Sequence, residues 1–586
     1  MLDRVEAAPN GKERVHAAAT GSSRARLVLV SAVASLLSIL PIVYAHRASP
    51  RTLVSAHGLL HAAIAQRFQS PSAVPGRPEN PFFAGAALPY YWFFHYLAAR
   101  VADLASIHAL YAFELMILAA MCVLWFTAVA LGSRLYGGIT PGLAIGFLAL
   151  AGANPFGVAI LLAKLAVGGS DVLADRPDYL WGIAHPILGV ARFNDPYALY
   201  GPLLNFFFNI SSRPIALTLL LVICFSLAAW LESGRLRAWI GLMLGSAACT
   251  AFSFLIGVTA GLALIGGLVV AWGAGAIVGF SGSTTANHAT QKTVKTAAAL
   301  LLGMLLASPT YYYFFLGSSD QSVHLSLRLW LIEGVALSGM VLAATAAIGV
   351  LRATGIRQQF LLATTAAGYA LLAGSAVVEL PVFNDSNLFH AAIFFLSVPA
   401  AGCFAPGIQW SRAQRLLSWG MMVLLFLPTT CVVAYAYLNR PAIALEIDGR
   451  QLYRLPRDSS LAHLYAWVRE MTASDAIFIL DPTHSIAAGG NMPEFPAMTG
   501  RVMFTTEPKN YMVTPNADAK LRHSLAVHLL DGAAATEREA AYLTSFNRPI
   551  YLVVAGSGDG GALGTLENRY GSAVFRDGDV SVLRVQ

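Results

Sequence analysis

The side chains that can do chemistry lie in three short stretches of an otherwise apolar chain. The first stretch contains His57, His61, Glu79, Tyr91 and His95. Residues 57 and 61 are four apart, so a helix would place both histidines on one face. Glu79 is the only carboxylate between residues 27 and 100, and a carboxylate near histidines suits general base catalysis. We therefore assign Glu79 and His57 as catalytic candidates, and the other three as substrate-binding candidates.

Simpler explanations exist for the same residues. The two histidines can form a structural or interfacial pair, and a lone glutamate in a loop is often solvated. Zinc binding is the least favoured explanation, because no glutamate follows His57 as in the HExxH pattern of metalloproteases. We therefore predict no resident metal or cofactor, and dependence on a divalent cation stays open.

The second and third stretches add further polar groups. Arg192, Asn194 and Asp195 join a cation, an amide and a carboxylate beside aromatic residues. An arginine at a membrane surface suits a phosphate group through bidentate hydrogen bonds, so Arg192 and Asn194 are substrate-binding candidates and Asp195 a catalytic one. An Arg–Asp ion pair is the alternative. Asp385 and Asn387 are also substrate-binding candidates, or they cap the helix that follows.

Composition defines the class of protein that must position these groups. Of the 586 residues, 56% are hydrophobic and 12% are charged, with a mean hydropathy of +0.61. Soluble domains average about 25% charged residues, so an ordinary soluble enzyme, a disordered protein and a nucleic-acid binder are excluded. The charges are uneven, with 39 in the first 438 residues and 30 in the last 148. We predict a cytoplasmic segment 1–26, a membrane domain 27–438 and a water-facing domain 439–586.

The membrane domain is expected to contain about eleven transmembrane helices. Runs of about 20 apolar residues are long enough to cross the hydrocarbon core of a bilayer. The first is predicted to be an uncleaved helix, because its polar leader is long for a signal peptide. The predicted spans are 27–45, 108–132, 138–160, 214–232, 238–254, 256–280, 296–315, 328–351, 358–380, 388–404 and 415–438.

The charge pattern predicts the orientation. Lys and Arg in short loops stay on the cytoplasmic side of a membrane. With the N-terminus inside, each short inside loop contains Lys or Arg, whereas the short outside segment 381–387 contains neither. Eleven crossings then place the C-terminal domain outside. We expect a multi-pass protein of the plasma (inner) membrane, in contact with membrane lipids.

Two outer loops and the C-terminal region complete the expected architecture. Loops 46–107 and 161–213 are too long to be simple connectors, and loops of this length often carry function. The C-terminal region is predicted to be a small α/β domain with a helix over 461–471 and strands over 476–480, 550–554 and 580–585. The glycine-rich run 556–561 lacks a Gly-Lys-Ser/Thr ending and a helix start, so we predict a flexible loop and not a phosphate-binding loop.

This pattern resembles the polytopic membrane glycosyltransferases of the GT-C superfamily, which use polyprenyl-phosphate sugars as donors. The likeness covers most of the chain as architecture. It rests on three sets of residues, 57–61 with 78–85 and 90–95, 384–389, and 464–469 with 474–478. One departure matters, because members of the superfamily place a catalytic aspartate, sometimes a glutamate, just after the first span. Here residues 46–68 contain no acid, so either Glu79 or Asp195 substitutes, or the transfer chemistry has been lost.

The resemblance implies an inverting enzyme that moves a sugar from a polyprenyl-phosphate donor to a glycan, lipid or protein acceptor of the cell envelope, at the outer face. Such a donor needs no nucleotide site, which agrees with the lack of a Rossmann or P-loop motif. A lipid-linked glycan flippase is the first alternative. It would place ionisable residues at mid-membrane, for which Glu114, Lys164 and Glu333 are candidates. The second alternative is a non-catalytic glycan-assembly protein on the same scaffold.

Overall fold

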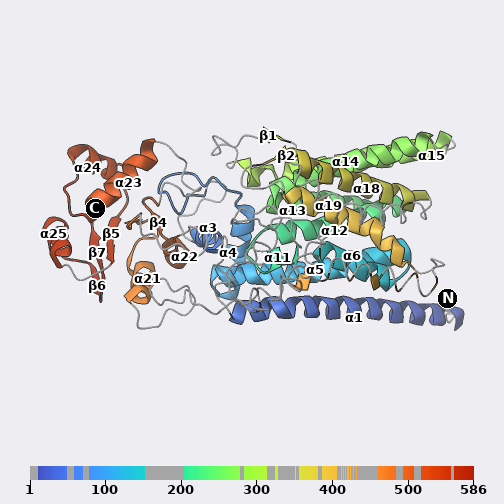
Figure 1. Cartoon of the computed structure of the whole chain (residues 1–586), viewed down its shortest axis with the longest axis horizontal. Helices are drawn as coiled ribbons and strands as arrows, with labels where there is room; N and C mark the ends of the chain where they lie inside the picture. Colours follow the sequence, from blue (N-terminus) through green and yellow to red (C-terminus); the bar gives the residue numbers. More distant parts are fainter. Residues whose placement is uncertain are drawn as a thin grey trace, which may run out of the picture.

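The computed structural model describes most of the chain (Figure 1). The described residues are 11–48, 58–69, 78–151, 203–277, 283–312, 324–326, 350, 355–380, 386–405, 460–482, 493–506, 517–555 and 560–585, with isolated positions between 411 and 438. They form a long helical bundle, and a mixed sheet with its helices lies beyond one end of that bundle (Figure 1).

Long apolar helices build the bundle. Seven of them, within the described residues, are long and apolar enough to cross a membrane. The candidate spans are Arg24–Arg47, Ala109–Tyr136, Arg213–Ser233, Phe254–Ala274, Thr290–Thr310, Arg357–Val377 and Ser386–Phe404. They lie in helices α1 (Gly11–Ala48), α5 (Ala109–Tyr136), α12 (Arg213–Ser233), α14 (Phe254–Ile277), α15 (Ser283–Leu306) with the short η1 (Ser308–Thr310), α18 (Gly355–Val377), and α19 (Ser386–Ala400) with η3 (Ala401–Phe404).

These spans agree with seven of the eleven predicted ones. The predicted span 238–254 is the shorter apolar helix α13 (Leu236–Phe252), and the start of 138–160 is α6 (Ile139–Ala151). Span 328–351 lies almost wholly outside the described residues, and 415–438 is described only at isolated positions. The total of eleven therefore stays a prediction.

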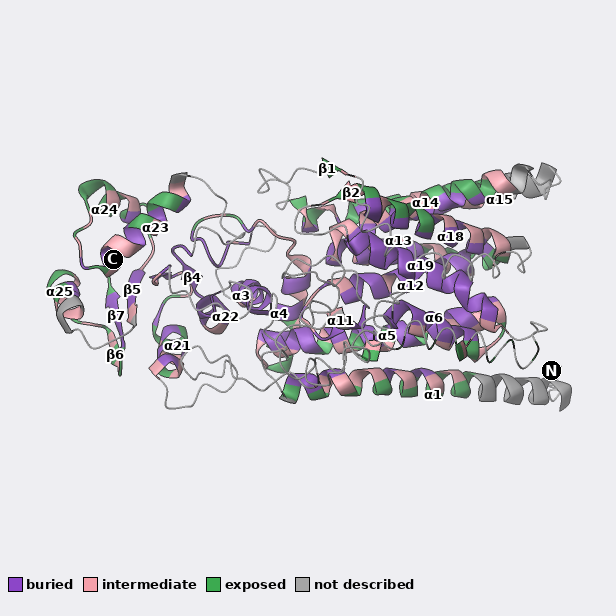
Figure 2. Ribbon diagram, viewed as in Figure 1, coloured by how far each residue is buried: buried purple, intermediate pink, exposed green. Residues whose placement is uncertain are grey.

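Burial distinguishes the centre of the bundle from its rim. Helix α19 is buried along almost its whole length, whereas α1 exposes large apolar side chains such as Leu29 and Leu37 (Figure 2). Inside a membrane no hydrophobic driving force brings helices together, so they associate through close packing of their backbones. Gly132 of α5 and Gly142 of α6 show such packing, because a Cβ atom added to Gly132 would lie 2.2 Å from the amide nitrogen of Gly142. An alanine at either position would push the two helices apart.

Shorter elements connect the bundle to the sheet. Within the first predicted outer loop, the chain forms α3 (Gly58–Gln69) and α4 (Phe93–Ala105), and the described end of the second loop holds α11 (Leu204–Phe207). Strands β1 (His324–Leu325) and β2 (Val378–Glu379) form a small antiparallel pair.

The C-terminal region forms a five-stranded sheet of order β4-β3-β5-β7-β6. Strands β3 (Ile477–Ile479), β4 (Val502–Met503) and β5 (Ile550–Ala555) are parallel, whereas β7 (Val580–Arg584) is antiparallel to β5 and to β6 (Phe575–Asp577). The flanking helices are α21 (Ser460–Met471), α22 (Phe495–Thr499), α23 (Ala517–Leu530), α24 (Glu537–Thr544) and α25 (Gly560–Tyr570).

The predicted helix 461–471 and strands 476–480, 550–554 and 580–585 are confirmed as α21, β3, β5 and β7. The prediction that no helix starts in the glycine-rich run was wrong, because α25 begins at Gly560. Glycine disfavours a helix intrinsically, but tertiary packing of an apolar face outweighs propensity. Leu566 supplies that face, since it is fully buried in the core of the sheet.

The first outer loop joins this sheet directly. The amide of Ala84 donates to the carbonyl of Met503 at 3.0 Å, and the amide of Met503 donates to the carbonyl of Pro81 at 2.9 Å. Residues 78–88 therefore pair with the β4 edge, which removes an unpaired strand edge and anchors the loop between bundle and sheet.

Candidate functional site

Buried ionisable side chains of the bundle gather at the end that faces the sheet. Six described His, Arg and Glu side chains before residue 405 are buried, and all six belong to this end. They are His46, His61, Arg67, His95, Glu114 and His390. Burying such groups costs free energy unless they are paired. Their concentration at one end therefore needs either a structural or a functional reason.

The first cluster ties the end of α1 to α5. Glu114, one turn into α5, is 3% exposed, and its Oε1 lies 3.1 Å from His46 Nδ1. Arg47 donates from Nη2 to the other carboxylate oxygen at 3.2 Å. Glu114 is thus a carboxylate that another helix places beside the end of the first span.

Hydrogen bonding fixes the proton of His46. Its Nε2 lies 2.9 Å from the carbonyl oxygen of Phe208, and a carbonyl only accepts, so Nε2 carries a hydrogen. Nδ1 then faces one carboxylate oxygen of Glu114 at 3.1 Å, and Arg47 donates to the other. Both oxygens of Glu114 are occupied, which suits a structural ion pair better than an open general base.

The second cluster pairs two of the predicted substrate-binding histidines. His61 Nδ1 lies 2.8 Å from His95 Nε2, so at least one ring is neutral. Burial lowers the pKa of His95 to about 3, against the weaker opposing effect of a hydrogen bond to the backbone of Tyr91. Phe94 and Phe113 surround His61, with ring centroids 5.6 and 5.9 Å away. This enclosure argues against direct contact of the two histidines with a substrate, and it assigns them a role in positioning their neighbours.

The third cluster is less enclosed and lies where α12 and α19 begin. Arg213, the first residue of α12, donates from Nη1 to Ser386 Oγ at 3.1 Å, and its guanidinium lies 4.2 Å from the centroid of the Phe206 ring. The neighbouring Ser212 hydroxyl donates to the hydroxyl of Tyr91 at 3.2 Å. A half-buried arginine between two helix N-termini favours the binding of an anion, because the free N–H groups and the positive ends of the helix dipoles attract negative charge as the guanidinium does.

Tyr91 is held in place by its neighbours. Its ring stacks on Tyr90 with centroids 4.2 Å apart, and the two hydroxyls lie 3.1 Å from each other. Its hydroxyl thus belongs to the same polar chain that leads through Ser212 to Arg213. Asn387, in the first turn of α19 after Ser386, is buried.

Glu79 lies in a different environment, between α3 and the C-terminal sheet. Arg548 Nη1 lies 2.5 Å from Glu79 Oε1, and Arg67 Nη2 lies 2.9 Å from Oε2. The amide of Gly85 also donates to Oε1 at 2.8 Å. Burial would raise the pKa of Glu79, but the hydrogen bond from Arg548 and the charges of both arginines outweigh it, so the pKa is lowered.

Arg67 shows that this arrangement is a structural clamp. It is 4% exposed, and its Nη1 donates to the backbone carbonyls of Ser474 and Gly500 in the C-terminal region. Burial lowers the pKa of Arg67, with Glu79 acting in the opposite direction. A carboxylate that two guanidinium groups hold, and whose pKa is lowered, is a poor general base. The geometry therefore revises the catalytic assignment of Glu79 to a structural one.

The structure places the predicted site residues in different environments. His61, His95 and Tyr91 lie together, and Asn387 lies beside the Arg213 cluster. Glu79 is bound by Arg67 and Arg548. The remaining candidates, His57, Arg192, Asn194, Asp195 and Asp385, lie outside the described residues.

Several site residues were missed by sequence reasoning. Arg213 has a local signal, because it precedes Pro214 at the start of an apolar run, which marks a helix N-terminus. His46 has a weaker one, as an ionisable residue at the edge of a span. Glu114 was named from the sequence only as a mid-membrane candidate for the flippase alternative. Within the described part of the chain, no group of three or more His, Cys, Asp or Glu side chains could hold a metal ion.

The fold is similar to that of solved GT-C glycosyltransferases. The structure of the arabinofuranosyltransferase AftD from Mycobacteria matches 95% of this chain with a TM-score of 0.53 and 14% sequence identity, and the chain covers 40% of that protein. At this identity the likeness concerns the fold alone.

Two other solved structures are similar at lower scores. ArnT from Cupriavidus metallidurans bound to undecaprenyl phosphate matches 95% of this chain and 98% of its own, with a TM-score of 0.48 and 10% identity. The archaeal oligosaccharyltransferase AglB from Archaeoglobus fulgidus, in complex with an inhibitory peptide and a dolichol-phosphate, matches 89% of this chain and 69% of its own, with a TM-score of 0.41 and 11% identity. No protein-family model matches the sequence. No curated protein matches it either.

Proposed function

We propose that this protein is a membrane glycosyltransferase that moves a sugar from a polyprenyl-phosphate donor to a glycan, lipid or protein acceptor of the cell envelope. The observation that carries the proposal is the match of 95% of the chain to the fold of an arabinofuranosyltransferase. The clustering of polar groups at the end of the bundle next to the sheet supports it. There a lipid-borne donor in the bilayer and a water-borne acceptor can meet.

In the proposed reaction, a carboxylate takes the proton of the acceptor hydroxyl, and the acceptor oxygen attacks the anomeric carbon of the sugar. The bond between that carbon and the phosphate oxygen breaks, and polyprenyl phosphate leaves with the electron pair. Attack opposite to the leaving group inverts the anomeric centre. Arginine side chains stabilise the charge that develops on the phosphate.

The roles follow from the geometry and from the remaining candidates. Arg213 is our choice for the phosphate, together with Arg192, because a half-buried guanidinium beside two helix N-termini favours an anion. Asp195 is our choice for the general base, since Glu79 and Glu114 are both held in ion pairs. Tyr91, Asn194, Asp385 and Asn387 are proposed to contact the sugar or the acceptor, and His57 is proposed to assist near the phosphate. No metal or cofactor is assigned.

The test uses the full-length protein in detergent or nanodiscs with a panel of polyprenyl-phosphate sugars. Asp195→Asn should abolish transfer while binding of the donor survives, whereas Glu79→Gln should retain turnover in the folded fraction. If Asp195→Asn is fully active and Glu79→Gln is inactive but normally folded, the assignment of the base is wrong.

A deletion strain tests the reaction class itself. Loss of one sugar residue from the envelope, with accumulation of a polyprenyl-phosphate monosaccharide, supports the transferase. Accumulation of a complete lipid-linked oligosaccharide supports a flippase instead. The position of Glu114 favours the transferase, because it lies one turn from the start of α5 and is paired with His46, rather than at mid-membrane.

A further inference from the structure

A second polar site lies at the opposite end of the bundle. Helices α12 and α14 end there, and α15 and α18 begin there, away from the C-terminal sheet (Figure 1). Their ends surround a small pocket of about 30 Å³ that opens to the outside. The pocket is lined by Leu231, Leu268, Ala271, Trp272, Lys292, Thr293 and Gln359.

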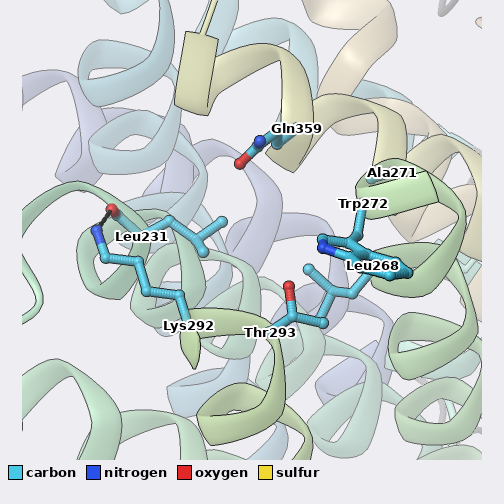
Figure 3. Close-up of a pocket in the computed structure, with 7 residues that line it drawn as sticks. All are labelled: Leu231, Leu268, Ala271, Trp272, Lys292, Thr293 and Gln359. Atoms are coloured by element: carbon cyan, nitrogen blue, oxygen red, sulfur yellow. Dashed lines mark hydrogen bonds between the residues drawn. The ribbon is translucent and has the colours of Figure 1, made fainter. Parts of the chain in front are cut away.

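The side chains of the pocket combine polar and apolar groups. Figure 3 shows Lys292, Thr293, Gln359 and Trp272 around a common space, with Leu231 and Leu268 beside them. Trp272 is 43% exposed, and its indole nitrogen donates to Thr290 Oγ1 at 2.9 Å. An indole with one polar contact and an exposed ring is typical of the membrane–water interface.

Lys292 is fixed inside the pocket. Its ammonium donates to the carbonyl oxygen of Leu231, near the last turn of α12, at 2.5 Å. Carbonyls in the last turn of a helix lack an intrahelical partner, and a cation there is favoured by the helix dipole. An ammonium has three donors, so this contact orients the group and leaves donors for another acceptor.

The charge around the pocket is mainly positive. At this end, the described residues include the cations Arg24, Arg26, Arg134, Arg235, Arg237, Lys292, Lys295 and Arg357, and the carboxylates Glu13 and Glu232, of which Glu232 pairs with Arg134. The sequence predicts that this end faces the cytoplasm. Basic pockets between transmembrane helices on that side suit the headgroups of anionic lipids.

We propose that this pocket binds an anionic phospholipid. Lys292 would hold the phosphate, and Thr293 and Gln359 would hydrogen-bond the polar headgroup. The acyl chains would run along the apolar outer surface of α14, where Val269 and Val270 are more than half exposed. The ligand is a two-chain lipid of the bilayer and not a donor of the proposed reaction, so the proposal stands independently of the glycosyltransferase function.

The experiment measures lipid binding to the full-length protein in detergent. Micelles containing phosphatidylglycerol or phosphatidylcholine are added, and binding is followed by thermal shift and by native mass spectrometry. Phosphatidylglycerol should raise the melting temperature and remain bound, phosphatidylcholine should do neither, and the effect should weaken with salt because it is electrostatic.

Lys292→Met keeps the aliphatic stem and removes the charge, and it should weaken phosphatidylglycerol binding about fivefold. Lys295→Met is the matched control, because it removes an exposed cation of the same helix that does not line the pocket, and it should change binding little. Because Lys292→Met also breaks the contact with Leu231, Gln359→Met serves as a second variant that should weaken binding without that loss.

Three results would overturn the proposal. Equal weakening by Lys292→Met and Lys295→Met would show only diffuse attraction between a basic surface and acidic lipid. The same thermal shift with inorganic phosphate alone would indicate a site for a free anion. Displacement of bound phosphatidylglycerol by polyprenyl phosphate at equal concentration would make the pocket a site for the donor's lipid and not for a bilayer phospholipid.

Discussion

Replacing Glu79 by Gln should loosen the contact between the first outer loop and the C-terminal sheet rather than remove a catalytic base. Glu79 holds Arg67 and Arg548 together, and the side chains of these three residues are 20%, 5% and 16% exposed. Breaking a buried pair costs about 3–5 kcal/mol, because it leaves a buried charge without a partner. Exposed pairs contribute about 0–1 kcal/mol. The low exposure of both arginines places Glu79→Gln near the lower end of the buried range, at about 3 kcal/mol.

Hydrogen exchange of the full-length protein measures this loss locally. The amides of Ala84 and Met503 bond across the contact that the clamp holds, so peptides covering them report its opening. A loss of about 3 kcal/mol raises the open population about a hundredfold, since each 1.4 kcal/mol is a factor of ten. Arg548→Met should have a similar effect, because it removes the other half of the pair.

The matched control is Glu567→Gln, which breaks the exposed pair of Glu567 with Arg576 in the same region. It should leave exchange at Ala84 and Met503 unchanged. The clamp is refuted if Glu79→Gln leaves that exchange unchanged while sugar transfer is lost, because a general base predicts that combination.

The pH dependence of the clamp has a definite sign. The pKa of Glu79 is lowered from the ordinary 4.5 in the folded protein. Its contribution to stability is therefore fully present above that value and is lost as the pH falls below it, when the carboxylate takes up a proton. The protection factor of the Ala84 amide, the intrinsic exchange rate divided by the observed one, should fall on acidification in the wild type, and this step should be absent in Glu79→Gln.

Three further predictions concern the bundle. Arg213→Gln should raise the KM for the donor about ten- to a hundredfold, because a charge-assisted hydrogen bond contributes about 1.5–3 kcal/mol. Arg213→Lys should retain part of the affinity, and equal KM values for Arg213→Gln and the wild type would exclude the phosphate role. Glu114→Gln should destabilise the protein by about 3 kcal/mol, measured by thermal unfolding. Glu232→Gln, which breaks a more exposed pair, should cost less, and similar losses in the two variants would show that the buried pair stabilises the protein no more than the exposed one. Because the pKa of His95 is about 3 against an ordinary 6.5, stability should fall as the pH drops from about 6.5 toward 3, since only the unfolded state takes up this proton; an unaltered slope in His95→Gln would exclude this cause.

Hydropathy was sufficient to find most of the architecture. A span such as α12 is apolar over 21 residues, and a strand such as β5 is a short apolar run between turn residues, so both are local features. The glycine-rich start of α25 was missed because a buried leucine, which only the folded sheet reveals, outweighs the local propensity.

The site was harder to predict because its pairings are long-range. Glu79 and Arg548 are 469 positions apart, and His46 and Glu114 are 68 apart. Each residue is ordinary in its local sequence, and only the topology brings the partners together. The four-residue spacing of His57 and His61 suggested a pair on one helix face, whereas the contact that the structure shows for His61 is with His95, across two helices.

Three acids at this end of the bundle are held by cations. Glu114 lies beside the end of the first span, where His46 and Arg47 hold both of its oxygens, and Glu79 is held by two arginines. Asp103 pairs with Arg100. A base must exchange its proton with an acceptor that arrives and leaves, so a carboxylate with both oxygens occupied by cations is unsuited to that step. The acids of the first outer loop and of α5 are therefore held in structural pairs, and Asp195, one of the aspartates of the second outer loop, is the residue on which our transferase proposal depends.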